Sequence, residues 1–148
     1  MGYGGLPGYY TQTTIYHMVP IYLIRIYIFL SLLIVTPSGF IFKFFQGPAS
    51  WWFNDYGAGV LYEVFWILVI FFLFPNKKSV RPIPLWVFTI TSGLEFLQLW
   101  HPCFLEEIRS YFLGSVLIGT SFTWWDFPHY AIGCIIGWGW MKYLLKKT

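Results

Sequence analysis

Four polar side chains at the ends of two apolar stretches have the spacing of a binding or acid–base site. Glu95 and Gln98 are three positions apart, so on a helix they project from one face. Asp126 begins a later apolar stretch, and His129 follows it at the same interval. Carboxylates and imidazoles exchange protons in general acid–base catalysis, and with an amide they also bind polar headgroups. These residues are therefore the first candidates for a site.

Two further acids and one cation extend this set. Asp55, Gly59 and Glu63 follow one another at four-residue steps, which predicts a small and polar helix face. Arg109 is the cation of an otherwise acidic segment, and a guanidinium pairs with carboxylates or binds an anionic headgroup through two parallel hydrogen bonds. No catalytic residue can be assigned. The candidate binding residues are Glu95, Gln98, Arg109, Asp126, His129, Asp55 and Glu63.

A purely structural role is open for each of these side chains. The helix dipole favours Asp126 at a helix N-terminus whatever its function. Gln98 can join neighbouring helices, and a protonated Glu95 can bond to backbone. Arg109 can have the purely structural role of an interfacial ion pair with Glu106.

The sequence predicts neither a cofactor nor a metal site. Cys103 and Cys134 are separated by 31 positions, and Cys134 lies inside an apolar run, which disfavours a disulfide. His101 and Cys103 are only two neighbouring ligand types, too few for a recognisable metal site. No nucleophile or phosphate-binding motif is present.

The elements that must position the candidate residues are long apolar runs. A helix that spans a bilayer needs about 20 mostly apolar residues. Four runs approach this length, at about residues 20–42, 57–74, 84–100 and 124–145. The segment between the third and fourth runs carries Glu106, Glu107 and Arg109 and is too polar to span easily.

The predicted fold is therefore all-α. We expect an integral membrane bundle of four transmembrane helices, with an interfacial or re-entrant helix between the third and the fourth. Residues 1–19 would form a short cytoplasmic N-terminal segment, and residues 20–148 would form one domain.

Composition supports the membrane assignment. Of the 148 residues, 57% are hydrophobic, 24% are aromatic and 10% are charged. Ordinary soluble domains have about 25% charged residues, and a short soluble chain cannot bury so much apolar surface. These values exclude a soluble enzyme, a basic nucleic-acid-binding domain and a disordered chain.

The basic residues predict an orientation. Lys77, Lys78 and Arg81 lie between the second and third runs, and further lysines lie in the C-terminal tail. Because Lys and Arg accumulate in cytoplasmic loops, both segments are expected on the cytoplasmic side. An even number of spans then places both termini there. The acidic residues and a group of tryptophans would mark the opposite face.

The order of motifs in the second half of the chain resembles a known family. The pattern is E-x-x-Q-L, a leucine with an acid and an arginine, L-G, F-x-W-x-D and Y-x-x-G. Here its positions are Glu95, Gln98, Leu99, Leu105, Glu106 or Glu107, Arg109, Leu113, Gly114, Phe122, Trp124, Asp126, Tyr130 and Gly133. Over about residues 40–140, this order resembles small bacterial membrane proteins known as domain of unknown function 2809.

A more distant resemblance covers about two helices. The E-x-x-Q element followed by an acidic helix start is similar to VanZ-like proteins, which are associated with glycopeptide-antibiotic resistance and the cell envelope. Both resemblances imply that the protein is located in a bacterial inner (plasma) membrane. Neither family brings an established mechanism, so no catalytic role is transferred.

Three functions fit these observations. The first is a non-catalytic binding or accessory protein whose outer-facing polar pocket holds a lipid or envelope-precursor headgroup. The second is an accessory subunit of a larger membrane complex. The third is an enzyme on a lipid-linked substrate, with Glu95 or Asp126 as general acid or base. We expect membrane lipids as partners, other membrane subunits as a second class, and no nucleic acid.

Overall fold

The computed structural model describes residues 9–119 and 121–147, which form helices and connections without a strand. The long helices are α1 (Tyr9–Lys43), α3 (Ala58–Leu73), α4 (Pro82–Leu97) and α7 (Asp126–Lys147). A short helix α2 (Ser50–Trp52) and a π-helical turn η1 (Phe53–Gly57) lead directly into α3. The predicted all-α class is confirmed.

The N-terminal segment and the third connection differ in detail from expectation. Residues 1–8 of the expected N-terminal segment lie outside the described residues, and the chain is already helical from Tyr9. The segment predicted as one interfacial or re-entrant helix forms two short helices, α5 (Cys103–Ser110) and α6 (Phe112–Ile118). Tyr111 separates them because its backbone is extended, with φ −84° and ψ 144°.

Proline and glycine explain several helix ends. Phe74 leaves the helical region at φ −124° and ψ 65°, as expected for a residue that precedes a proline. Pro82 opens α4, where a missing N–H costs nothing because that donor has no intrahelical partner. Gly119, at φ +79°, ends α6 in a conformation that favours glycine.

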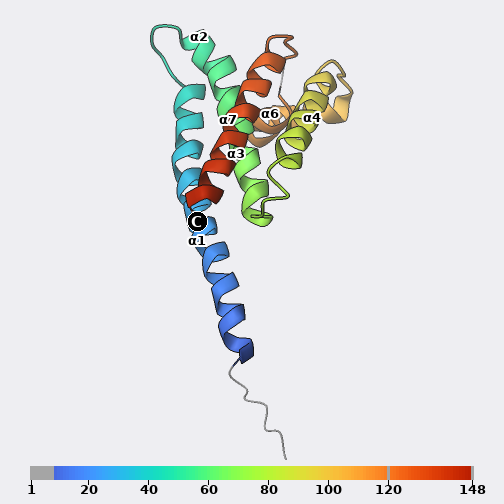
Figure 1. Cartoon of the computed structure of the whole chain (residues 1–148). Coiled ribbons are helices and arrows are strands. Elements are labelled where there is room, and N and C mark those ends of the chain that lie inside the picture. The colour runs from blue at the N-terminus through green and yellow to red at the C-terminus, as the bar shows by residue number, and fades with distance from the viewer. Residues whose placement is uncertain (1–8, 120, 148) are drawn as a thin grey trace, which may run out of the picture.

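Helix α3 lies at the centre of the bundle, between α1, α4 and α7 (Figure 1). Two glycines let α7 approach it closely. A Cβ on Gly133 would lie 2.6 Å from the Cβ of Glu63, and one on Gly137 would lie 2.7 Å from Cδ1 of Ile67. The small residues of the last helix therefore serve packing within the chain.

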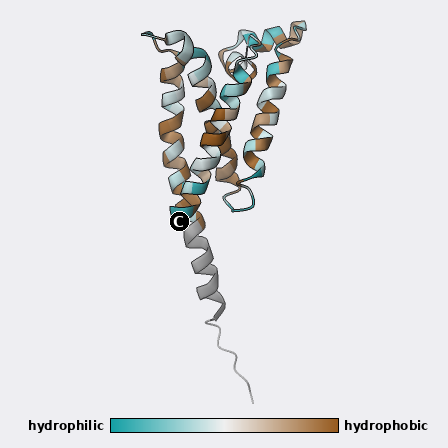
Figure 2. Ribbon diagram, turned by 45° about the horizontal axis from the view of Figure 1, so that its top comes forward, coloured by the Kyte–Doolittle hydropathy of each residue, from teal (hydrophilic) through white to brown (hydrophobic). Residues whose placement is uncertain are grey.

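The bundle carries much of its apolar surface outward. Ile21–Lys43 and Ser50–Leu73 are each long and apolar enough to cross a membrane, and Pro82–Leu97 is a shorter apolar helix. Only 22% and 33% of the apolar windows of the two longer segments are buried, unlike the core helices of a soluble protein. Figure 2 shows hydrophilic residues gathered mainly in the connections at the ends of the helices.

The two ends of the bundle differ in charge. The connection from α3 to α4 and the end of α7 lie at one end, which carries most of the lysines (Figure 1). There Lys147 Nζ lies 5.1 Å from the ring centre of Tyr27 on α1. The start of α7, the end of α4, and helices α5 and α6 lie at the other end with most acids. We call this the acidic end.

Candidate functional site

Glu95 is the centre of a hydrogen-bonded group at the acidic end. Its side chain projects from α4, and the residue is 1% exposed. Its Oε2 accepts bonds from Gln98 Nε2 at 2.8 Å and from the Tyr130 hydroxyl at 3.0 Å. Its Oε1 accepts the backbone N–H of Thr123 at 2.9 Å. One carboxylate thus joins α4, α7 and the connection from α6, and its buried oxygens are satisfied.

This group borders a cavity of about 730 Å³ at the acidic end. Helices α1, α3, α4, α6 and α7 all contribute to its wall. This volume is within the range of small-molecule pockets. Its charged and amide-bearing lining residues are Lys43, Asn54, Asp55, Glu95, Gln98 and Asp126.

Gln98 has unused hydrogen-bonding capacity at this cavity. The residue is 6% exposed and lines the wall. Its amide nitrogen bonds to Glu95, but its Oε1 has no hydrogen-bond partner. Asn54 also lines the cavity, and its Oδ1 is likewise buried without a partner. Buried acceptors are normally bonded, so both atoms favour a ligand or water in this space.

Asp126 lies where α7 begins, beside the Glu95 group. Its carboxyl faces that of Glu95, with which it shares a side-chain contact, and Asp55 and Lys43 are its other charged neighbours. The helix N-terminus favours a negative charge at this position. Lys43 ends α1, and its Nζ makes one long bond of 3.4 Å to the carbonyl of Asn54.

The π-helical turn η1 sets the position of Asp55. It spans the five residues Phe53–Gly57, whose π-helical turn is wider than a turn of α-helix. Asp55 lines the cavity, whereas Glu63, two turns further on, does not. Gly59, between them at the same four-residue spacing, lines the cavity with Asp55, whereas Glu63 lies buried further along α3.

Arg109 does not line the cavity and belongs to a separate network of polar contacts. Its Nη2 donates to the carbonyl of Leu97 at 2.9 Å, and its Nη1 to that of Trp100 at 3.2 Å. Leu97 is the last residue of α4, and Trp100 lies just after the turn that follows it. Nη1 also donates to Glu106 at 2.7 Å. Arg109 therefore caps α4 and ties α5 to it.

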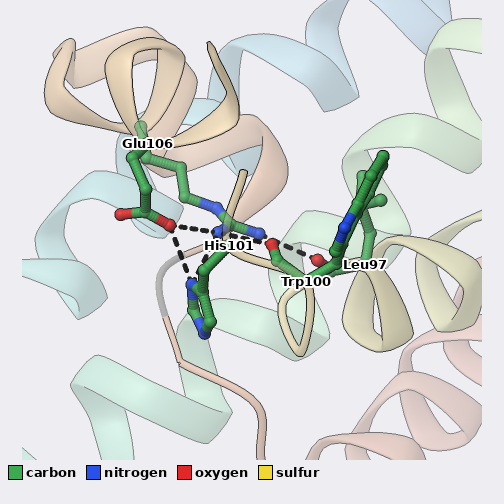
Figure 3. A network of polar contacts seen from close by, with 5 residues as sticks. Leu97, Trp100, His101 and Glu106 are labelled. Carbon is green, nitrogen blue, oxygen red and sulfur yellow. Dashed lines mark hydrogen bonds and ion pairs between the residues drawn. The ribbon is translucent and has the colours of Figure 1, made fainter. Parts of the chain in front are cut away.

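Glu106 connects His101 with this arginine. The Nδ1 atom of His101 lies 2.8 Å from Oε1 of Glu106 (Figure 3). Because the acceptor is a carboxylate, this nitrogen carries the proton in that contact. The bond from His101, and after it the bond from Arg109, holds the pKa of Glu106 below its ordinary value. The exposed position of Glu106 limits the strength of the ion pair.

His129 does not line the cavity either. Its Nδ1 lies 2.7 Å from the carbonyl of Trp125, one turn earlier, so this nitrogen donates. Its ring stacks on Tyr56 with 4.4 Å between ring centres, and Trp52 meets it edge-on. The imidazole therefore joins α7 to η1 on the outside of the acidic end.

Glu63 is buried in the interior of the bundle. The residue is fully buried, and its Oε2 accepts a bond from the thiol of Cys134 at 3.3 Å. Its Oε1 has no hydrogen-bond partner. The approach of Gly133 closes α7 over it.

The structure thus brings together four of the seven sequence-predicted site residues. Glu95, Gln98, Asp126 and Asp55 share the cavity, whereas Arg109, His129 and Glu63 lie elsewhere. Sequence reasoning missed Tyr130, Thr123 and Lys43 as parts of the site. For Tyr130 the signal was present, because it follows Asp126 by one turn. Thr123 contributes its backbone N–H, which no side-chain pattern reports.

These features define an all-helical protein with apolar outer surfaces and a polar cavity at its acidic end. A family profile described as "Protein of unknown function (DUF2809)" matches residues 49–134. The chain belongs to this family. The match confirms the first resemblance and gives no support to the VanZ-like one. Neither the curated proteins nor the solved structures compared with the chain give a match.

Proposed function

We propose that this protein is a four-span protein of the bacterial inner membrane that binds a lipid or envelope-precursor headgroup without catalysing a reaction. Its binding site would be the cavity at the acidic end. Both termini would lie in the cytoplasm, and the acidic end would face outward. In addition to the two segments able to cross a membrane, α4 would be the third span and α7 the fourth.

Helix lengths support these two additional spans. Helix α7 has 22 residues, which is about 33 Å of helix and enough to cross the hydrocarbon core. Helix α4 has 16 residues, or about 24 Å. Turn hydrogen bonds continue from its end to Trp100, and a short span is accommodated by local thinning of the bilayer. Both helices expose large apolar side chains, among them Trp86, Ile90 and Ile135.

The charge distribution supports the orientation. The connection from α3 to α4 carries Lys77, Lys78 and Arg81, and α7 ends in Lys146 and Lys147. Positive residues next to spans favour the cytoplasmic side. The cavity lies at the opposite end, where it would meet the outer leaflet.

The cavity itself is the observation that carries the proposal. It is about 730 Å³ in volume, and the buried Glu95 and Gln98 line it with the half-buried Asn54 and Asp126, inside a bundle with apolar outer faces. Polar groups inside a membrane bundle are expensive and commonly mark a ligand or substrate position. Several helices supply its wall, which suits a preformed binding site.

Purification in mild detergent followed by mass spectrometry of retained lipids tests the proposal. Val116→Trp would place a large ring at the cavity wall from α6, where the residue is 38% exposed and tolerates bulk. Leu113→Trp is the matched control, because Leu113 lies on the same helix but does not line the cavity. We expect a retained lipid that is lost only in Val116→Trp.

Two outcomes contradict this role. Equal retention in both variants would place any bound lipid outside the cavity. A fixed set of co-purifying proteins without a retained lipid would instead indicate an accessory subunit.

A further inference from the structure

The charges around the cavity are unbalanced. Asp55, Glu95 and Asp126 line it, and among the described lining residues Lys43 is the one cation facing them. Arg109, the counter-charge expected from the sequence, is instead bonded to the end of α4. Glu95 is buried, Asp126 is half-buried and Asp55 is exposed, and neighbouring carboxyls in such a partly desolvated space favour a positive charge beside them. A cationic group therefore fits the cavity better than an anionic one.

The hydrogen-bonding groups of the wall point to the same class of ligand. Several of its hydroxyl donors are already used: the Tyr130 hydroxyl bonds to Glu95, the Tyr62 hydroxyl to the carbonyl of Leu117, and the Ser115 hydroxyl to that of Phe112. The atoms without a partner, Oε1 of Gln98 and Oδ1 of Asn54, are both acceptors. A ligand that completes this wall must donate hydrogen bonds.

These requirements distinguish between kinds of cation. No three His, Cys, Asp or Glu side chains in the described part of the chain converge as metal ligands would. A quaternary ammonium carries no N–H and would leave the free acceptors unbonded. A primary ammonium carries a positive charge and three N–H donors, like that of lysine.

We propose that the cavity binds the primary ammonium group of a zwitterionic aminolipid headgroup. This inference rests on the binding function proposed above. The carboxyl of Asp126 and the free Oε1 of Gln98 would receive the ammonium. Lys43 would pair with the headgroup phosphate, since its single bond to a carbonyl is long and leaves N–H donors free.

Glu95 and Asp126 have different roles in this proposal. Glu95 already accepts three hydrogen bonds from the protein and positions the wall. Asp126 is only half-buried and faces the cavity, so its carboxyl is available to a ligand. Gln98 has both properties, because its amide nitrogen bonds to Glu95 while its oxygen has no partner in the protein.

Native mass spectrometry of the full chain in detergent tests the ligand class. The protein is titrated with phosphatidylethanolamine, phosphatidylcholine and phosphatidylglycerol of identical acyl chains. We expect phosphatidylethanolamine to bind roughly tenfold more tightly than the other two, as the gain of one or two charged hydrogen bonds implies. Asp126→Asn and Gln98→Leu should each remove most of this preference.

Glu107→Gln is the matched control for Asp126→Asn. It makes the same kind of acid-to-amide change at the acidic end, but Glu107 is exposed on α5 and does not line the cavity. We expect its lipid preference to equal that of the unchanged protein. Size-exclusion chromatography checks that each variant is folded. A folded Asp126→Asn protein that keeps the full preference would overturn the ammonium assignment.

Further outcomes separate this inference from the function on which it rests. If the protein instead prefers phosphatidylcholine or phosphatidylglycerol and loses that lipid in Val116→Trp, this result would overturn the ammonium assignment and leave the binding function standing. Absence of any retained lipid would overturn both. Competition with soluble ethanolamine identifies the source: displacement indicates that the amine alone is sufficient, and its failure indicates that the lipid phosphate and chains are required.

Discussion

Glu95 and Arg109 are both buried charged residues at the acidic end, yet their surroundings differ. Glu95 lies within α4, and Arg109 bonds to the carbonyl of Leu97, which ends the same helix, and to that of Trp100. Arg109 directs its terminal nitrogens to backbone carbonyls and to Glu106, and its buried Nε, which has no partner, does not face the cavity. The Glu95 group borders a cavity and leaves acceptor atoms free. Free hydrogen-bonding capacity facing a space, and not the burial of a charge alone, therefore distinguishes a candidate binding site.

Glu63 supports this distinction from a third position. It is fully buried and has an oxygen without a partner, but it does not line the cavity. Gly133 brings α7 so close that a Cβ there would lie 2.6 Å from the Cβ of Glu63. The unbonded oxygen of Glu63 therefore has no space beside it for a headgroup.

The largest expected effect is that of Glu95→Ala. The substitution removes the acceptor for Gln98, Tyr130 and the N–H of Thr123. We expect the free energy of unfolding to fall by about 3–5 kcal/mol, because several buried donors lose their charged partner. Lipid retention should be lost as well. Denaturant unfolding in detergent measures the first effect, and an unchanged midpoint would show that this group is not a structural hub.

Arg109→Ala should separate the two regions. It removes the cap on the last carbonyls of α4, and we expect a loss of about 2–3 kcal/mol in unfolding free energy. The lipid preference of the folded protein should be unchanged, because Arg109 does not line the cavity. Arg81→Ala, an exposed change at the other end of α4, is the control. A changed preference in Arg109→Ala would join the regions into one site.

Tyr130→Phe should have a smaller effect. It removes one donor to Glu95 and keeps the aromatic ring. We expect about 1 kcal/mol of destabilisation, since hydrogen bonds between membrane helices contribute modestly. Tyr143→Phe, an exposed position on the same helix, is the control. Equal unfolding midpoints for the two variants would indicate that the Tyr130 bond adds nothing to stability.

The smallest expected effect is the pH dependence of the Arg109 network. The folded-state pKa of Glu106 is lowered, by His101 first and Arg109 second. Its stabilisation is therefore complete above the unfolded-state pKa of about 4.3 and is lost as pH falls through the lower folded-state value. Glu106→Gln should reduce the acid sensitivity of the thermal unfolding midpoint, and Glu107→Gln should not. Identical acid profiles in both variants would contradict a stabilising ion pair.

Part of the site follows from local spacing. Glu95 and Gln98 are one helical turn apart, and the structure joins them by a hydrogen bond. The pairing of Arg109 with Glu106 also follows from a three-residue spacing. Its backbone partners were not predictable, because they are carbonyls nine and twelve residues away, at the end of another helix and just beyond it. The four-residue steps from Asp55 to Glu63 also do not tell how far a cavity extends along α3, so the position of Glu63 outside it could not be derived from the sequence.

The sequence by itself determined the all-helical class, the approximate limits of the long helices and the asymmetry of charge between their ends. These properties depend on continuous apolar runs and on residues close together in the chain. Only the tertiary structure decided which polar residues share a cavity and which are bonded to backbone. That choice depends on helix packing, above all the close contact of α7 with α3 at Gly133 and Gly137, and packing joins residues far apart in the sequence.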